Sequence, residues 1–328
     1  MKKTLDSSVV KLTNYRSVWG YIHKNKQATI PQISKDIGLS LPTVTRAVDY
    51  GVAEGIIEPD GVIGAERGRK AQVYKLNADR MHILYMYIDS DVILFRKSDF
   101  RTRTIKSGEV PICDDNVLSK LDELIETSME ADPLIRIAVI AVTGIVKDGM
   151  ILDSAMLPSL NGVNIVEHIN EKFCISAVAE NDLHAAAHVA LNYSDCEDNV
   201  ALFYAYGKFN SGSAIIVNGK VLCGASGAAG ELENVPLSVL KADADRIEFC
   251  SEQLRVMISL INPDKVVIYE LIDGLDTSKL ISTTKKKLKP YLVPEFKTRE
   301  NFFEDCFLGL RFILRIKIEK DMQEQLDL

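Results

Sequence analysis

Three polar residues, Glu180, Asn181 and Asp182, follow the apolar run "ISAVA" and stand directly before an alanine-rich stretch. A carboxylate at the N-terminus of a helix, within hydrogen-bond reach of an alcohol, could act as a general base. The alternative is structural, because Asn and Asp side chains commonly cap helices by accepting a backbone N–H. The residue types alone therefore leave two interpretations of Asp182 open, a ligand-facing carboxylate and a helix cap.

Side chains that could bind a metal are scattered along the chain. The six cysteines lie far apart, with no C-x-C or C-x-x-C pair, which favours reduced thiols over disulfides or a structural zinc site. His184 and His188 are spaced i, i+4 after Asp182, but no third ligand stands near them in the sequence. Because a zinc site needs more ligands, we predict that these histidines are solvated or cap the helix, and that the protein holds no metal or cofactor.

These residues belong to a long segment in which predicted strands and helices alternate. The stretches "MHILYMYID" and "VILFRKSDF" predict a hairpin around the turn Asp89-Ser90-Asp91, and "IRIAVIAVTGIV" predicts one buried strand. Amphipathic helices are predicted over "VLSKLDELIETSME", "NIVEHINEKF", "RIEFCSEQLRVMISLINP" and "FFEDCFLGLRFILRIKIEKDM". The alternation, with antiparallel hairpins, predicts an α/β architecture of two lobes.

The first eighty residues have a different texture. A helix predicted over "NYRSVWGYIHKNK" is followed by "TIPQISKDIG", which ends at Gly38, and by "LSLPTVTRAVDYG", in which Ser40 is a good N-cap and Pro42 lies in the first turn. Two helices joined by a short turn that contains glycine predict a helix-turn-helix. Its last helix carries Thr43, Thr45 and Arg46 near the N-terminus, at positions that meet base edges in a DNA major groove.

A basic hairpin follows the helix-turn-helix. "IIEPDGVIGAERGRKAQVYKL" predicts two strands around a tip with Arg67, Arg69 and Lys70, which would contact phosphates or the minor groove as the wing of a winged helix. Residues 1–80 hold 13 Lys and Arg against 8 Asp and Glu, whereas the remainder holds 26 against 38. The combination predicts binding to double-stranded DNA. The alternative is a helical protein-interaction module with a hairpin.

The apolar stretches also bear on where the protein works. None is long enough to span a bilayer, and no early apolar run resembles a signal peptide. With the scattered thiols, this predicts a cytoplasmic protein that does not contact membranes.

Several motifs together resemble a known family. A winged helix followed by "GIVKDGMILDSAMLPSLNGVNI", "AENDLHAAA" and "NGKVLCGASGAAGELENVPL" is similar to the ROK group of repressors and sugar kinases. The resemblance covers nearly the whole chain and implies an N-terminal winged helix-turn-helix followed by a two-lobed actin-like ATPase (ribonuclease H-like) domain. It implies a DNA-binding domain over 1–78, a first lobe over 79–178 completed by the helix 303–328, and a second lobe over 179–302 for sensing and oligomerisation.

The resemblance also implies roles for single residues. In the family's kinases the aspartate that matches Asp182 removes a proton from the sugar hydroxyl, and the residues that match Asn181 and Glu231 hold other hydroxyls. The zinc-binding histidine of many members is Asn234 here, and the cysteine cluster that should follow is absent. In the stretch that forms the sugar pocket of the family, Met156 replaces an asparagine and Ser159-Leu160 replaces Gly-Trp.

Three elements that hold ATP in the kinases have lost their glycines. The turn Asp89-Ser90-Asp91-Val92 replaces an Asp-x-Gly-Gly-Thr motif, residues 207–213 carry bulky side chains, and Tyr269-Glu270-Leu271 replaces a glycine cluster. Phosphate cradles need bare backbone N–H groups. The sequence therefore predicts a domain that does not use ATP and is not an enzyme.

The resulting hypothesis is a transcription regulator, specifically a repressor of carbohydrate-related genes. Its partners would be a double-stranded DNA operator, a sugar or sugar-derivative effector and further copies of the chain, as a homodimer or homotetramer, because one recognition helix reads only a few base pairs. Two alternatives remain. One is an active sugar kinase carrying a DNA-binding domain, and the other is a DNA-binding scaffold that senses no ligand.

Overall fold

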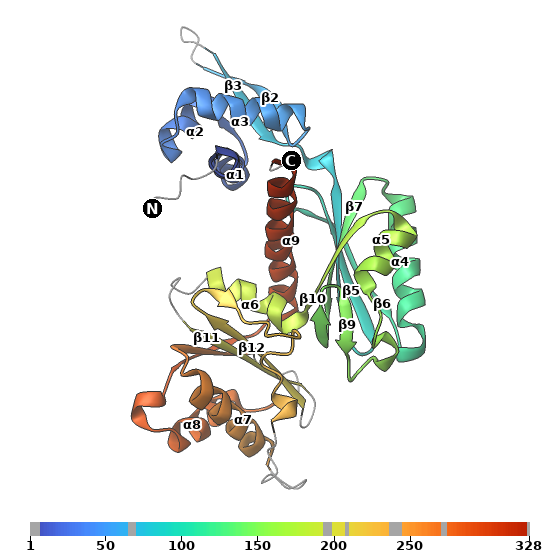
Figure 1. Ribbon diagram of the computed structural model, residues 1–328, viewed down its shortest axis with the longest axis vertical. Helices are drawn as coiled ribbons and strands as arrows, with labels where there is room; N and C mark the ends of the chain where they lie inside the picture. The colour runs from blue at the N-terminus through green and yellow to red at the C-terminus, as the bar shows by residue number, and fades with distance from the viewer. Residues whose placement is uncertain are drawn as a thin grey trace.

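The fold is described from a computed structural model, which covers residues 7–64, 70–192, 199–206, 210–235, 245–269 and 274–326. In these residues the chain forms a small N-terminal unit and two five-stranded sheets with helices between and outside them (Figure 1). Short 3-10 helices connect some of the elements: η1 Ala78–Arg80, η2 Asp114–Asn116, η3 Pro158–Leu160, η4 Leu232–Asn234 and η5 Pro290–Leu292.

The N-terminal unit has the architecture of a winged helix. Its elements are α1 Ser7–Asn25, β1 Ala28–Thr29, α2 Ile30–Ile37, α3 Leu41–Ala53, β2 Ile57–Ile63 and β3 Ala71–Leu76. β3 pairs antiparallel with both β1 and β2. The three helices bury a common core that includes Val18, Ile33 and Val44, each 0% exposed. The helices and the hairpin predicted for this segment are thereby confirmed.

Local signals explain the turn between α2 and α3. Thr29 and Gln32 form a reciprocal capping box at the start of α2, and Gly38 ends that helix in the left-handed conformation with φ of 72°. The side chain of Ser40 then accepts the N–H of Thr43 and caps α3. Only three residues separate the helices, so α3 starts in a fixed direction relative to α2.

The first large sheet has the strand order β10-β7-β4-β5-β6. Its strands are β4 His82–Ile88, β5 Val92–Ser98, β6 Thr104–Pro111, β7 Ile135–Val142 and β10 Ser176–Asn181. β7 pairs in parallel with β4 and β10, whereas β5 and β6 extend the sheet antiparallel. α4 (Val117–Ala131) and α5 (Ile165–Phe173) cover one face and bury Leu84, Met86 and Ile88 of β4. The alternate residues of β4 therefore face the other side.

The second sheet has the order β13-β12-β11-β14-β15. Its strands are β11 Val200–Tyr206, β12 Asn210–Val217, β13 Lys220–Val221, β14 Lys265–Tyr269 and β15 Glu295–Arg299. α7 (Arg246–Ile261) and α8 (Thr277–Lys287) cover one face, where Ala201 and Phe203 of β11 contact Leu254 and Leu280. As in the first sheet, the alternate residues of β11, which include Leu202, face the opposite side of the sheet and belong to the core between the two sheets.

Two helices, α6 (Asp182–Asn192) and α9 (Phe302–Leu326), lie between the sheets and share one core with both. Tyr85 of the first sheet and Leu202 of the second belong to this core. The helices approach closely at Gly309, where a Cβ would lie 1.8 Å from the carbonyl oxygen of Ala185. The relative position of the two sheets is therefore set by one pair of helices.

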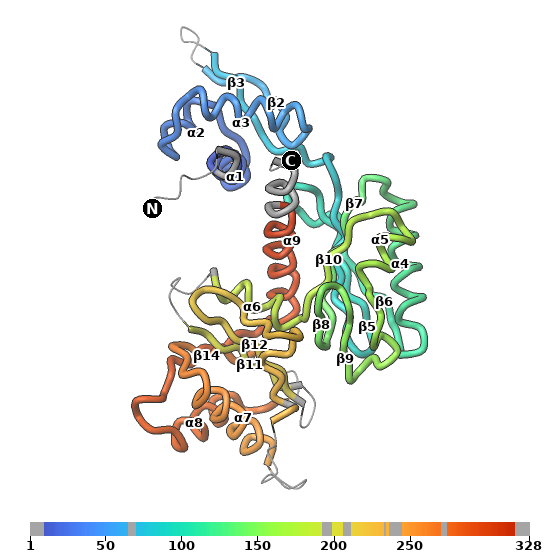
Figure 2. The backbone as a smooth tube through the Cα atoms, in the orientation of Figure 1, coloured from blue at the N-terminus to red at the C-terminus, as the bar shows by residue number. Residues whose placement is uncertain are grey.

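α9 also reaches the winged helix. It runs from the second sheet, past the first, to α1 (Figure 2), with which it is in contact. His23 at the end of α1 lies close enough to Arg315 of α9 that burial and this cation together lower the pKa of His23. A single helix thus touches all three parts of the described structure.

Other details of the larger segment differ from the sequence-based expectation. The run "IRIAVIAVTGIV" forms two strands, β7 and β8 (Ile145–Lys147), and β8 pairs with β9 (Met150–Asp153). The break falls at Gly144, whose φ is 149° and where a Cβ would lie 2.4 Å from the carbonyl oxygen of Asp153. β6, β9, α8 and β15 had not been predicted. β10 runs across residues 178 and 179, where the boundary between the lobes was placed.

Candidate functional site

The cap of α6 is Asn181. Its side-chain Oδ1 accepts the N–H of His184 at 2.9 Å, which is the contact of an N-cap with the third residue of its helix. Its Nδ2 donates to the carbonyl oxygen of Gly144 at 2.7 Å and so ties α6 to the end of β7. Asn181 is 5% exposed. Of the two residues that could have capped the helix, Asn181 does so, which leaves Asp182 available for another role.

Asp182 is the first residue of α6 and is buried between the sheets, with 5% of its surface exposed. One carboxylate oxygen, Oδ2, accepts hydrogen bonds from the hydroxyl of Tyr87 at 3.3 Å and from that of Thr143 at 3.2 Å. The other, Oδ1, accepts the N–H of Leu183 at 2.8 Å. An oxygen that two alcohols already contact has the geometry of a hydroxyl-binding group.

The surroundings of Asp182 disfavour its charge. Burial raises the pKa of Asp182 to about 7, and the nearby carboxylate of Asp89 adds to the rise, although the hydrogen bonds from Leu183, Thr143 and Tyr87 oppose it. Burial also raises the pKa of Asp89, and Asp91 adds to that rise. A carboxyl group poised near neutrality can exchange a proton with a hydroxyl or respond to a bound ligand.

Asp182 gives the stability of the protein a pH dependence of definite sign. Its pKa is about 7 in the folded chain against 3.8 for an unperturbed aspartate, so between these values the folded state holds a proton that the unfolded state has lost. The free energy of unfolding must therefore fall as the pH rises from about 4 to about 7. In urea titrations the Asp182→Asn variant should lack this loss and gain on the order of a few kcal/mol over wild type between about pH 5 and pH 8.

A matched control for this prediction is Glu130→Gln, which removes an exposed carboxylate on α4. Its stability should follow that of the wild-type protein at every pH. If the free energy of unfolding of D182N also followed that of the wild-type protein at every pH, the folded state would not retain the proton on Asp182.

The loop that carries Glu231 approaches the same region from the second sheet. Gly227 has φ of 82°, and a Cβ there would lie 2.5 Å from the carbonyl oxygen of Val146, directly after the segment that Asn181 contacts. Gly230 is similarly confined, because its φ is 97° and a Cβ there would lie 2.6 Å from the carbonyl oxygen of Ser213. Glu231, half-buried, then starts η4. The structure thus brings this loop and the Asn181–Asp182 pair to the same short segment, residues 143–146.

Two of the three segments that were expected to have lost ATP-binding glycines can be examined in the described residues. In the first, the N–H of Asp89 donates to the carbonyl oxygen of Val92 at 3.0 Å, so the turn is closed on itself. In the third, Tyr269 is fully buried, its ring packs edge-on against Phe302, and its hydroxyl donates to Asp305 at 2.8 Å. An aromatic side chain therefore fills the end of β14. In the second element, residues 207–209 lie outside the described residues.

The DNA-binding candidates lie at the start of α3 and on the hairpin. Arg46 is exposed, Thr43 is half-buried, and the hydroxyl of Thr45 donates to the carbonyl oxygen of Leu41 at 2.9 Å within the helix. Lys70 is exposed just before β3. Arg67 and Arg69 lie outside the described residues. The cationic group that the structure presents at the head of α3 is therefore Arg46.

Sequence reasoning missed two residues of α1 beside this surface. Lys11 and Asn14 line a hollow together with Thr43 and Arg46. Lys11 is exposed, and its Nζ lies 5.6 Å from the centre of the Tyr15 ring. A second cation next to Arg46 follows from the packing of α1 on α3, which the chain distance between them concealed.

The prediction that His184 is solvated is wrong. The residue is 2% exposed, because α6 buries that side against its neighbours, and its Nδ1 lies 3.1 Å from Oε1 of Glu180. His188 is half-buried. Within the part of the chain that the structure describes, no group of three or more His, Cys, Asp or Glu side chains could hold a metal ion.

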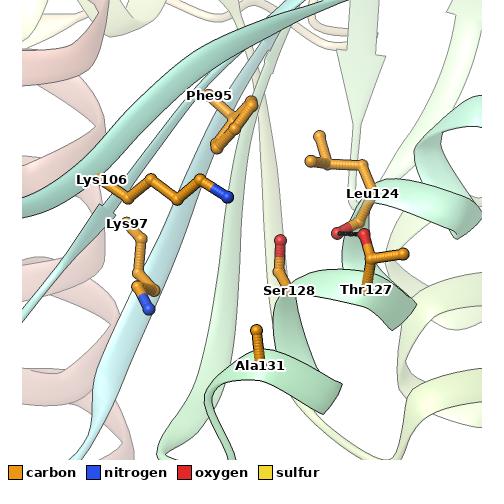
Figure 3. A pocket seen from close by; sticks show the side chains of 7 residues that line it. All are labelled: Phe95, Lys97, Lys106, Leu124, Thr127, Ser128 and Ala131. Carbon is orange, nitrogen blue, oxygen red and sulfur yellow. Dashed lines mark hydrogen bonds between the residues drawn. The ribbon is translucent and has the colours of Figure 1, made fainter.

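A further hollow lies on the opposite face of the first sheet, between α4 and the strands β5 and β6 (Figure 3). Lys106 and Lys97 extend along it, opposite Thr127 and Ser128 of α4. Nζ of Lys97 is already paired with Asp132 at 2.5 Å. The sheet separates this hollow from Asp182, so it contributes nothing to the site.

A comparison with protein families agrees with this geometry. Residues 106–251, which include Asn181, Asp182 and Glu231, match the model of the ROK family. The segment matched by the ROK model begins in β6 and ends in α7.

Similar proteins include regulators and kinases. The chain is 24% identical over 304 residues to a xylose repressor from Caldicellulosiruptor bescii. The aligned region covers 85% of this chain and 75% of the repressor. Among solved structures, the chain superposes on a ROK family transcriptional regulator, described as a homologue of the E. coli MLC protein, with a TM-score of 0.70 at 16% identity. The superposition covers 97% of this chain and 98% of the regulator. A ROK family glucokinase from Streptomyces griseus, solved with glucose and AMPPNP, superposes with a TM-score of 0.54 at 12% identity. That superposition covers 71% of this chain and 98% of the glucokinase chain. The predicted fold, a winged helix followed by an actin-like domain, is confirmed.

The structure also bears on membrane contact. Among the helices described, none is both long and apolar enough to cross a membrane.

Proposed function

We propose that this protein is a sugar-responsive transcriptional repressor of carbohydrate-related genes, whose winged helix binds an operator and whose ROK domain senses a sugar without phosphorylating it. The observation that carries the proposal is the exposed Arg46 at the head of α3, in a winged helix that α9 connects to the buried Asp182 region. The similarity to a xylose repressor over most of the chain supports it.

The operator contacts follow from the geometry of a winged helix on DNA. Thr43, Thr45 and Arg46 would meet base edges in the major groove, since they occupy the first turns of α3. Lys11 would add a phosphate contact beside Arg46. The wing residues Arg67, Arg69 and Lys70 would contact phosphates or the minor groove. A homodimer or homotetramer would place two such helices on a palindromic operator.

The sugar would be sensed at Asp182. A sugar hydroxyl can replace the Tyr87 or Thr143 hydroxyl on Oδ2, because both are alcohols at hydrogen-bond distance. Asn181 keeps one amide hydrogen beyond the one given to Gly144, and Glu231 starts the loop that faces residues 143–146. Since Asp182 is 5% exposed, sugar must bind a state in which the lobes are further apart, and that preference shifts the population of states.

α9 provides the route from the sugar to the DNA. A separation of the lobes would move α6, whose first residue is Asp182. The motion would pass to α9, because the two helices are in such close contact at Gly309 that a Cβ there would clash with the backbone of Ala185. α9 ends against α1. Sugar binding would therefore change the position of the winged helix, and with it the spacing of two recognition helices in a dimer.

Catalysis is not part of the proposal, although many proteins of this fold are kinases. Positioning of the nucleotide supplies most of phosphoryl-transfer catalysis. The buried Tyr269 and the closed turn after Asp89 support the loss of that positioning. The pKa of Asp182 would suit a base in a kinase as well as a sensor, so the nucleotide elements, rather than Asp182, distinguish the two functions.

The experiment is fluorescence anisotropy with DNA from the region upstream of the protein's own gene, titrated with salt and then with sugars, sugar phosphates and amino sugars. We expect salt-dependent binding that one sugar releases. Asp182→Asn should keep the affinity for DNA and weaken the response to that sugar by about tenfold, since an amide replaces one of the two carboxyl oxygens that the sugar hydroxyl can contact. Binding that no sugar changes would support a scaffold, and sugar-dependent ATP hydrolysis abolished in D182N would support the kinase.

A further inference from the structure

The turn between β5 and β6, residues 99–103, contacts the winged helix, which lies beyond one end of the first sheet (Figure 1). From this turn Arg101 donates through Nε to the carbonyl oxygen of Leu76, the last residue of β3, at 2.6 Å. Its Nη2 donates to Oε1 of Glu58 in β2 at 2.9 Å. One side chain of the turn therefore holds both strands of the hairpin, at the end away from its tip.

Phe100, next to Arg101, also contacts the winged helix. Its N–H donates to the carbonyl oxygen of Ala78 at 3.0 Å, in the connection that follows β3. Its half-buried ring packs against the core of the winged helix. The contact thus combines hydrogen bonds with apolar packing, and in this respect it differs from a single ion pair on the surface.

The turn itself is closed by hydrogen bonds. The carboxylate of Asp99, whose side chain is 4% exposed, accepts the backbone N–H of Arg103 at 2.9 Å and its Nε at 2.8 Å. In return, the N–H of Asp99 donates to the carbonyl oxygen of Arg103 at 3.0 Å. The N–H of Thr102 donates to the carbonyl oxygen of Asp99 at 2.9 Å. Because these bonds fix the backbone of the turn, Phe100 and Arg101 are held in one orientation toward the winged helix.

The covalent connection between the winged helix and the first sheet is short. Only residues 77–81 separate β3 from β4. At the start of this connection the N–H of Asn77 donates to the carbonyl oxygen of Ile56 in the winged helix at 2.9 Å. At its end the N–H of His82 donates to the carbonyl oxygen of Leu134, directly before β7, at 2.8 Å. Both ends of the connection are therefore bonded to the part of the structure that they join.

The ion pair between Arg101 and Glu58 is only partly exposed to solvent. The side chain of Arg101 is 25% exposed and that of Glu58 is 37% exposed. Nζ of Lys75 lies 3.6 Å from the same carboxylate oxygen of Glu58, so two cations approach it. An isolated ion pair on a protein surface contributes little to stability. Here the planar guanidinium also has a backbone carbonyl as a second acceptor, a geometry that favours arginine over lysine.

We propose that Arg101 is a positioning residue for operator binding, because it fixes the winged helix to the first sheet so that the two move as one body. The inference rests on the proposed function, and it makes Arg101 a determinant of specificity that is separate from the DNA-contacting residues. α9 contacts both β4 and α1, so a displacement of α9 carries the winged helix and the first sheet together. In a dimer the spacing of the two recognition helices then follows the spacing of the two first sheets.

The single tryptophan of the chain, Trp19, reports the motion of the winged helix. It lies in α1, its ring stacks on Tyr50, and its Nε1 donates to the carbonyl oxygen of Ala47 at 3.2 Å. The test is the time-resolved fluorescence anisotropy of Trp19 in the full-length protein, without DNA or sugar. After the fast motion of the ring itself, the wild-type decay should contain only the correlation time of the whole molecule. In Arg101→Ala a component with a several-fold shorter correlation time should appear, since a winged helix released from the sheet tumbles as a smaller unit.

Glu58→Ala removes the same contact from the side of the winged helix, and it keeps the proposal testable if the Arg101 variant does not fold. It should produce the same added component, and the double variant should show no more of it than either single variant, because both remove one interaction. Lys106→Ala is the control, since it removes an exposed cation of β6 outside the contact, and its decay should match the wild type. The proposal is overturned if the wild-type protein already shows the added component, or if neither variant does.

Operator binding gives a second readout, which a merely structural role of Arg101 would not change. Moving the two half-sites of a palindromic operator apart by a few base pairs should weaken wild-type binding about 100-fold, because both winged helices can no longer bind at once. Arg101→Ala should lose about tenfold or less, because its winged helices can adapt to the new spacing. An equal loss for both proteins would overturn the role in specificity. The added anisotropy component in the two variants, without any DNA binding by the wild-type protein, would support the fixed attachment and contradict the proposed function alone.

Discussion

Arg46→Ala should weaken operator binding roughly 10- to 100-fold, corresponding to about 1–3 kcal/mol for a lost base contact. Arg46 is exposed at the head of α3, where its guanidinium can approach a guanine edge, and Thr43 and Lys11 flank it. The proposed contact is to a base, so the loss should be larger on the operator than on unrelated DNA. Anisotropy titrations on both DNA fragments at the same salt concentration measure the difference.

Two variants distinguish base recognition from general charge. Lys70→Ala removes an exposed cation of the hairpin and should weaken binding to both DNA fragments alike, while the salt dependence drops by about one ion. Lys286→Ala removes an exposed cation on α8 and should change nothing. If Arg46→Ala reduced the two affinities equally, Arg46 would be a phosphate contact and the specificity would have to come from other residues.

Gly309→Ala is expected to destabilise the protein by about 3 kcal/mol or more. A Cβ at this position would lie 1.8 Å from the carbonyl oxygen of Ala185 and 2.4 Å from its carbon. Both are backbone atoms of a helix, so the clash can be relieved only if α6 and α9 move apart. The core between the sheets would then lose contacts along both helices. Urea unfolding followed by circular dichroism measures the loss.

Gly20→Ala is the matched control, since Gly20 is also a helical glycine but a Cβ there meets no described heavy atom within 4 Å. Alanine favours helices over glycine, so this variant should gain up to about 1 kcal/mol. Opposite signs for the two substitutions would tie the effect to the helix contact. A Gly309→Ala protein as stable as the wild type would mean that the helices are not packed as closely as described.

The winged helix could be predicted from the sequence because its signals are local. The capping box at Thr29, the left-handed Gly38 and the N-cap Ser40 act within a few residues of each other, and each is visible in the sequence. The same reasoning missed α8 and β15, whose sequences are mostly polar and so lack a clear apolar period. It also missed the break at Gly144, because the reason for that break is the backbone of Asp153, on another strand.

The candidate site shows the same limit. That a residue at the start of α6 would cap the helix followed from residue type, but the choice of Asn181 over Asp182 depends on Tyr87 and Thr143, which come from other strands. The contact of Asp182 with Tyr87 spans 95 positions of the chain and could not be inferred from spacing. Sequence patterns identify helix ends, whereas the pKa of a buried carboxyl group such as that of Asp182 depends on tertiary contacts.

The position of α9 in the chain has a consequence for synthesis of the protein. The core between the sheets is built from β4 and β7 on one side and β11 and β14 on the other, and it is completed by residues 302–326. The winged helix and the first sheet can form while the ribosome is still translating, but Tyr85, Leu202 and their neighbours stay uncovered until α9 emerges. Nascent chains should therefore depend on chaperones until α9 has been synthesised.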